Sequence, residues 1–245
     1  MRVEAVLTPA EIATLAERPL DGCVCVVFDV LRATSTFLTA LHHGAACIHP
    51  VATIEEAFAL RDALGGKALL GGERHGKRIE GFDLGNSPLE YTSERVAERE
   101  IVSTTTNGTL ALRACMEASR VYAGALLNLD ALATRLRRDA DAIPRLLLVC
   151  AGSGSFLALE DALAAAALLE RLSPNVTGMD DAALLLQGWY RACADPPLEI
   201  LRASSNGRRL QEIGLGSDLD WCGQVAVLDT VAYLQGGKLV AESAV

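Results

Sequence analysis

The stretch that decides the fold is Cys23-Val-Cys-Val-Val-Phe28, which runs directly into Asp29-Val-Leu-Arg32. Six consecutive apolar residues are typical of a strand that is covered on both faces, as the strands of a parallel sheet are. Comparable strand-like runs recur at 67–70, 100–103 and 145–150, between Ala- and Leu-rich stretches with helical periodicity. This alternation predicts an α/β fold with three layers, α/β/α, around a largely parallel but mixed sheet.

The order of strands and helices restarts near position 127, where a weak break divides the chain. We therefore expect two similar α/β halves, 1–127 and 128–245, which either share one sheet in a single compact domain or form two lobes around a cleft. Helices are expected at 34–43 and 155–172, and a last strand at 225–231.

Composition limits the function classes. The 245 residues include 22 basic and 31 acidic side chains, a net charge of −9 with no basic block, which argues against a nucleic-acid or anionic-membrane surface. No apolar run approaches the ~20 residues of a membrane span, and the N-terminus has no signal-peptide pattern. The seven cysteines are odd in number and lie in apolar runs, as expected for small buried side chains in a reducing cytoplasm. We expect a cytoplasmic protein. Whether it forms a homodimer is left open.

Polar residues follow four of the predicted strands at the point where each strand ends. Ligands of open α/β sheets bind beyond the carboxyl ends of the strands, so these loops are expected to converge. Hydroxyls, glycines and free N–H groups at helix starts are typical of a phosphate site. The residues are Asp29, Arg32, Thr34, Ser35, Thr36, Glu73, Arg74, Thr105, Thr106, Asn107, Gly108, Thr109, Gly152, Ser153 and Asp161.

Three carboxylates in this set, Asp29, Glu73 and Asp161, indicate a bound Mg²⁺, because carboxylates beside a phosphate need a cation between them. Asp29, Arg32 and Arg74 are the candidate catalytic residues, and the hydroxyl, amide and glycine positions are candidates for binding the phosphate. Structural alternatives exist: Asp29 could be a helix N-cap or turn residue, and Glu73 could belong to an ion pair. Whether Asp29 or water attacks phosphorus stays open.

Histidine and cysteine patterns add little to this site. The four histidines show no metal-ligand spacing, and His75 is a candidate acid only because it lies beside Glu73. Cys23-x-Cys25 has no second ligand pair at zinc spacing.

A cysteine phosphatase needs Cys-x₅-Arg, but the residue six positions after Cys150 is Phe156. A haloacid-dehalogenase-type phosphatase needs Asp-x-Asp, but Leu31 stands at the second position.

Taken together, these loops resemble the 2-phosphosulfolactate phosphatase family. The resemblance spans nearly the whole chain in the same order, and its most specific parts are Gly81-Phe-Asp-Leu-Gly-Asn-Ser-Pro88 and the Thr-Asn-Gly loop at 104–109. It also covers the stretches at 29–36, 71–74, 150–152, 159–161, 207–214 and 218–219.

The resemblance implies an α/β fold and Mg²⁺-dependent hydrolysis of 2-phosphosulfolactate to sulfolactate and phosphate, a step of coenzyme M biosynthesis. At 204–207 the chain reads Ser-Ser-Asn-Gly instead of the expected Ser-x-His-Gly, which puts a general-acid histidine there in question. The segment at 150–156 also departs from the family pattern, but by a smaller difference. The alternative function is a non-catalytic binding module for a phosphorylated or nucleotide ligand.

Overall fold

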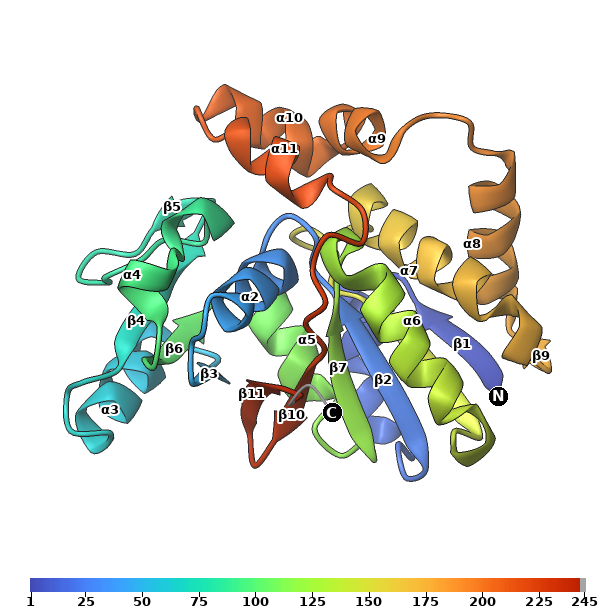
Figure 1. Ribbon diagram of the computed structural model, residues 1–245, viewed down its shortest axis with the longest axis horizontal. Coiled ribbons are helices and arrows are strands. Elements are labelled where there is room, and N and C mark those ends of the chain that lie inside the picture. Colours follow the sequence, from blue (N-terminus) through green and yellow to red (C-terminus); the bar gives the residue numbers. More distant parts are fainter. Residues whose placement is uncertain (243–245) are drawn as a thin grey trace.

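The computed structural model describes residues 1–242, which form an 11-stranded mixed sheet in the order β5-β4-β6-β3-β11-β10-β7-β2-β8-β1-β9 (Figure 1). The strands are β1 (Arg2–Val6), β2 (Cys23–Phe28), β3 (Cys47–Pro50), β4 (Leu69–Arg74), β5 (Lys77–Arg78), β6 (Glu100–Thr104), β7 (Arg120–Gly124), β8 (Arg145–Cys150), β9 (Gly178–Met179), β10 (Ala232–Gln235) and β11 (Lys238–Ala241). Most neighbouring strands are parallel, and the expected α/β class with a largely parallel, mixed sheet is confirmed.

The central strand β2 contributes to two separate hydrophobic cores. Val24, Val26 and Phe28 pack on one face, and Cys25 and Val27 pack on the other. Because successive strand side chains point to opposite faces, a strand that is apolar throughout is buried on both sides.

Helices cover both faces of the sheet. The first face is covered by α6 (Leu129–Arg138), α7 (Leu159–Leu172) and α8 (Asp181–Ala192), and α9 (Pro197–Ala203) packs against α7. The second is covered by α1 (Pro9–Ala13), α2 (Ala33–His42) and α5 (Gly108–Ala114), and α3 (Ile54–Ala63) contributes to a smaller core against β4 and β6. A short helix, α4 (Ser93–Val96), precedes β6. The expected three layers are present.

The C-terminal hairpin β10–β11 fills the middle of the sheet. β10 pairs antiparallel with β7, and β11 pairs antiparallel with β3. Gly236 and Gly237 form its two-residue turn with φ angles of +58° and +79°, which glycine adopts without strain. The two groups of parallel strands therefore meet through this hairpin.

The expectation of a strand at 225–231 is wrong. That segment is irregular, with a φ of +56° at Ala226, and its backbone hydrogen bonds are scattered. Ala226 and Leu228 donate to the carbonyls of Leu126 and Leu127, and the Val231 carbonyl accepts from the Glu242 N–H. With no strand alongside it, the segment forms no ladder. The expected helix at 155–172 begins later, at Leu159, since residues 153–156 form a tight turn.

Helices α9, α10 (Ser205–Glu212) and α11 (Ser217–Cys222) lie together over the carboxyl ends of the central strands (Figure 1). Ser204 caps α10 by accepting a hydrogen bond from the Gly207 N–H. Strands from either side of position 127 pair directly, because β2 and β8 are matched over six residues. No helix in residues 1–242 combines the length and apolar character that crossing a bilayer requires.

Asn128 connects the end of β7, the start of α6 and the segment that precedes β10. Its fully buried amide accepts from the Ala125 N–H and donates to the carbonyls of Ala123 and Thr230.

Asn128→Ala should lower the free energy of unfolding by about 2–4 kcal/mol, because three buried backbone groups lose their partner. Calorimetry should record a clear fall in Tm. The exposed Gln224→Ala is the control, and equal Tm values for the two variants would contradict this account.

Candidate active site

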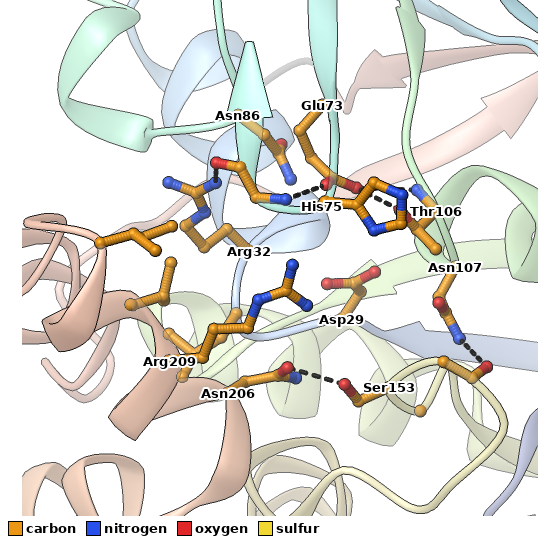
Figure 2. Close-up of a pocket in the computed structure, with 16 residues that line it drawn as sticks. Asp29, Arg32, Glu73, His75, Asn86, Thr106, Asn107, Ser153, Asn206 and Arg209 are labelled. Atoms are coloured by element: carbon orange, nitrogen blue, oxygen red, sulfur yellow. Dashed lines mark hydrogen bonds between the residues drawn. The ribbon is translucent and has the colours of Figure 1, made fainter. Parts of the chain in front are cut away.

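A cavity of about 220 Å³ lies at the carboxyl ends of β2, β4, β6 and β8, against helix α10 (Figure 2). Asp29, Glu73, Thr106 and Gly152 line it, one from the end of each strand or the loop that follows. The structure thus brings the four strand ends together. The volume is below the range typical of drug-sized ligands and suits a small substrate.

Asp29 is held rigidly where β2 ends. One carboxylate oxygen, Oδ1, accepts the Ala33 N–H at 3.0 Å, and the Asp29 N–H donates to Thr34 Oγ1. The other oxygen, Oδ2, lies so near Gly108 that a Cβ there would come within 2.5 Å of it, so this position requires glycine. Burial, reinforced by the carboxylates of Glu73 and Glu160, raises the pKa of Asp29 from 3.8 to about 7.

Glu73 is buried near the end of β4, and N–H and O–H groups fix its carboxylate. Oε1 accepts from the N–H and the hydroxyl of Thr106, at 2.9 and 2.8 Å, and Oε2 accepts from the Gly76 N–H at 2.7 Å. The carboxylate therefore ties the β4–β5 turn to the loop before α5. No cation pairs with it in residues 1–242, so it is not part of a structural ion pair.

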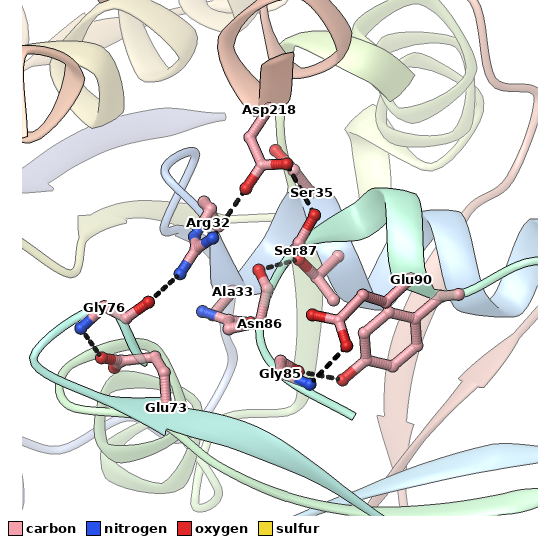
Figure 3. A network of polar contacts seen from close by, with 12 residues as sticks. Arg32, Ala33, Ser35, Glu73, Gly76, Gly85, Asn86, Ser87, Glu90 and Asp218 are labelled. Carbon is pink, nitrogen blue, oxygen red and sulfur yellow. Dashed lines mark hydrogen bonds and ion pairs between the residues drawn. The ribbon is translucent and has the colours of Figure 1, made fainter. Parts of the chain in front are cut away.

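Arg32 forms a buried ion pair with Asp218 of α11, at 2.6 Å (Figure 3). Its second terminal nitrogen donates to the Gly76 carbonyl, and Ser87 donates to the other Asp218 oxygen. Arg32 also lines the cavity. Its guanidinium therefore joins the loop after β2 to the helical cap while contributing positive charge to the cavity wall.

Asp161 of α7 is fully buried behind the cavity. Its two carboxylate oxygens accept the N–H groups of Val30 and Gly152, at 2.8 and 3.0 Å. Burial, with repulsion from Asp29 and Glu160, raises its pKa well above the usual range. The carboxylate lies outside the lining and fixes the backbone after β2 and β8; its role as a metal ligand stays a prediction.

A polar chain leads from the core to the cavity wall through Asn206 of α10. Its amide donates to buried Glu160 at 2.7 Å and accepts the Ser153 hydroxyl at 2.7 Å. Burial raises the pKa of Glu160. Asn206 therefore occupies, at the cavity, the position where a histidine was expected, and it acts as a hydrogen-bonding residue that cannot donate a catalytic proton.

The hydroxyls of Thr34, Ser35 and Thr36 are fully buried and lie outside the cavity lining. Thr34 accepts the Asp29 N–H, while Ser35 and Thr36 donate to the carbonyls of Val30 and Asn86. They hold the cavity backbone in place, and direct contact with a phosphate stays a prediction.

Arg74, Thr105 and Thr109 also lie outside the lining. Arg74 donates to Thr104 Oγ1 at 2.9 Å and to the Glu73 carbonyl, and Thr105 and Thr109 bond to each other's backbone. Four predicted phosphate-binding residues line the cavity: Thr106, Asn107, Gly152 and Ser153.

Sequence reasoning missed Arg209 and Asn86, and gave His75 little weight; all three line the cavity. Figure 2 shows the Arg209 side chain extending from α10 toward Asp29, and it forms no ion pair or side-chain hydrogen bond in residues 1–242. The amide oxygen of Asn86 is buried without a hydrogen-bond partner among the described residues. Asn86 lies in the 81–88 stretch, one of the most specific parts of the family resemblance. Arg209 follows no predicted strand, and its only signal was that it lies in the 207–214 stretch of the same resemblance.

Comparisons with known proteins agree with one another. The family model of 2-phosphosulpholactate phosphatase matches residues 7–237. The chain is 39% identical, over 91% of its length and 93% of the relative, to the probable 2-phosphosulfolactate phosphatase of Thermotoga petrophila. A relative of the same name from Carboxydothermus hydrogenoformans is 37% identical over 99% of this chain and 98% of its own. The chain therefore belongs to the 2-phosphosulpholactate phosphatase family.

Proposed function

We propose that the protein is a Mg²⁺-dependent phosphatase that hydrolyses 2-phosphosulfolactate to sulfolactate and phosphate. One observation carries the proposal: two buried carboxylates, Asp29 and Glu73, face the same small cavity as the unpaired guanidinium of Arg209. A small dianionic phosphate ester with further acidic groups complements such a cavity once a cation balances the carboxylates. Family membership and the names of the relatives support the choice of substrate.

Oxygen donors in the cavity fit a divalent cation. Asp29 Oδ2 accepts no hydrogen bond from the described residues, and the amide oxygen of Asn86 is buried without a partner. Carboxylate and amide oxygens suit Mg²⁺. Asp29, with Glu73 and Asn86 beside it, would hold the ion. When bound, Mg²⁺ supplies charge neutralisation and polarises the phosphoryl group.

The remaining groups orient the ester and complete the charge balance. Arg209 and Arg32 both bring a guanidinium group to the wall, where they would bind and orient the acidic groups of the substrate. Leu31, Leu210 and Ile213 form an apolar wall that limits substrate size. His75 is the imidazole in the lining and would protonate the departing oxygen.

A binding module would have donor loops like these but no use for a buried Asp29 at a pKa of about 7. A cysteine nucleophile also has no support. Within the described residues no cysteine lines the cavity, and burial raises the pKa of Cys150 well above its usual range.

Phosphate release from 2-phosphosulfolactate tests the assignment directly. We expect kcat/KM for this ester to exceed that for 2-phospholactate, which lacks the sulfonate, by tenfold or more, since losing one charged contact costs about this much. Chelation of divalent cations should abolish turnover, and Mg²⁺ should restore it. Equal turnover of both esters would overturn the substrate assignment, and full activity after chelation would overturn the metal dependence.

Asp29→Asn separates a catalytic role from a helix-capping role, because Asn caps about as well as Asp. We expect kcat to fall by about 10³-fold or more with Tm unchanged or raised, since a buried charge is removed without losing the Ala33 contact. The matched control is Asp180→Asn at the N-cap of α8, which should keep parental kcat. A near-parental kcat in Asp29→Asn would make Asp29 a structural residue.

Arg209→Gln should raise KM at least tenfold, because the variant keeps hydrogen-bonding capacity but loses the charge that binds the substrate anion. The neighbouring Arg208 donates to the Ala203 carbonyl and lies outside the cavity lining, so Arg208→Gln should leave KM unchanged. Steady-state kinetics of both variants make the comparison. Equal KM values would remove Arg209 from the site.

The raised pKa of Asp29 also predicts how stability varies with pH. Its folded-state pKa of about 7 lies above the ordinary 3.8, so the folded state retains a proton that the unfolded state releases. The free energy of unfolding of the metal-free protein therefore falls as pH rises from about 4 through 7. Mg²⁺ should raise Tm more at pH 8 than at pH 5, as calorimetry can record. An equal gain at both values, or an undiminished gain in Asp29→Asn, would contradict this.

A further inference from the structure

Three side chains of metal-binding type meet on strands β3 and β6, away from the cavity. Cys47 and His49 are two residues apart on β3 and share one face, and the register pairs Cys47 with Glu100 of β6. Cys47 Sγ lies 3.4 Å from His49 Nε2 and 3.5 Å from Glu100 Oε2, and Nε2 and Oε2 are 2.7 Å apart. One sulfur, one nitrogen and one oxygen thus surround a common point.

These separations match the edges of a tetrahedral zinc site. In a tetrahedral zinc site, the bonds are about 2.3 Å to sulfur and about 2.0–2.1 Å to nitrogen or oxygen. The sulfur ligand therefore lies about 3.5 Å from the nitrogen ligand and from the oxygen ligand. The same geometry separates nitrogen from oxygen by about 3.3 Å. The two distances from Cys47 Sγ, 3.4 and 3.5 Å, therefore already match those of a zinc site. An ion that replaces the proton shared by His49 and Glu100 needs only a small outward movement of those two side chains.

We propose that Cys47, His49 and Glu100 bind one zinc-like divalent cation, with water as the fourth ligand. Thiolate, imidazole and carboxylate are the ligands that zinc takes in proteins, whereas Mg²⁺ prefers oxygen alone. Cys47 is buried and the Glu100 side chain is 42% exposed, so the ion has a fixed anchor and an entry path from solvent. Lys238 of β11 adds positive charge nearby, which lowers the affinity for the cation.

The geometry does not suit a Cys–His–Glu catalytic relay. A relay uses both imidazole nitrogens, one toward the nucleophile and one toward the carboxylate. Here Sγ and Oε2 both approach the same nitrogen, Nε2. Three atoms that converge on one point are the arrangement of metal ligands.

The position indicates a structural role. Cys47 and Glu100 are the first residues of β3 and β6, at the amino ends of the strands, whereas the proposed substrate site lies at the carboxyl ends. The bound ion would link two neighbouring strands at the edge opposite to the cavity. We expect it to raise Tm by about 5 °C or more at a hundredfold excess over its dissociation constant.

Cobalt titration of the metal-free, full-length chain tests the site. Co²⁺ should produce a thiolate-to-cobalt charge-transfer band and strong tetrahedral visible bands, saturating at one thiolate-bound ion per chain and bleached by Zn²⁺. Cobalt held by Asp29 and its neighbours has oxygen ligands and gives no charge-transfer band, so the result is independent of the proposed phosphatase site.

Cys47→Ser and His49→Ala should abolish the charge-transfer band, and Glu100→Gln, a change at a half-exposed residue, should weaken binding at least tenfold. The matched control is Cys193→Ser, the partly exposed cysteine outside the cluster, which should keep the band. Circular dichroism checks that each variant is folded. No band in the parent, a band that survives Cys47→Ser, or a band lost in Cys193→Ser would each overturn the proposal.

Discussion

The guanidinium of Arg32 and the carboxylate of Asp218 approach to 2.6 Å although they lie 186 positions apart in the sequence. Both are almost fully buried, so removing one partner would leave a charge in the interior without compensation. The pair fixes α11 above the loop that follows β2 (Figure 3). Helix α11 contacts α10, and α10 carries the cavity residues Arg209 and Asn206. The wall of the cavity therefore depends on this ion pair between residues far apart in the sequence.

Around that pair, the protein concentrates negative charge in its interior. Asp29, Glu160 and Asp161 are all buried. Glu160 raises the pKa of Asp29, and both Asp29 and Glu160 raise the pKa of Asp161. Such clustering lowers stability unless a cation is present, and groups of this kind are characteristic of functional sites. Asp161 and Glu160 hold backbone and amide groups in position, which leaves Asp29 as the carboxylate of the three that lines the cavity.

The sequence was sufficient to predict the α/β class, the central strand β2 and the convergence of four strand ends, because buried parallel strands leave a local apolar pattern. It could not show which polar residues face the cavity. Thr34 and Arg74 lie near strand ends, as Asp29 does, but their side chains do not face the cavity. Thr34 accepts a hydrogen bond from the Asp29 N–H, and Arg74 donates to the Thr104 hydroxyl. Arg209 reaches the cavity only because α10 folds over the sheet, and the hairpin β10–β11 replaces the strand expected at 225–231. Both depend on long-range packing that no local pattern encodes.

The place of that hairpin has a consequence for how the chain acquires its structure. β7 and β3 have no ladder with each other, and the strands that join them are β10 and β11, near the C-terminal end of the described residues. Until 232–241 has been synthesised, each group of parallel strands has an exposed inner edge of unpaired backbone groups. Such edges are templates for pairing with other chains. Completion of the sheet is therefore a long-range event, and the inner edges of β3 and β7 are exposed to aggregation until the hairpin pairs with both.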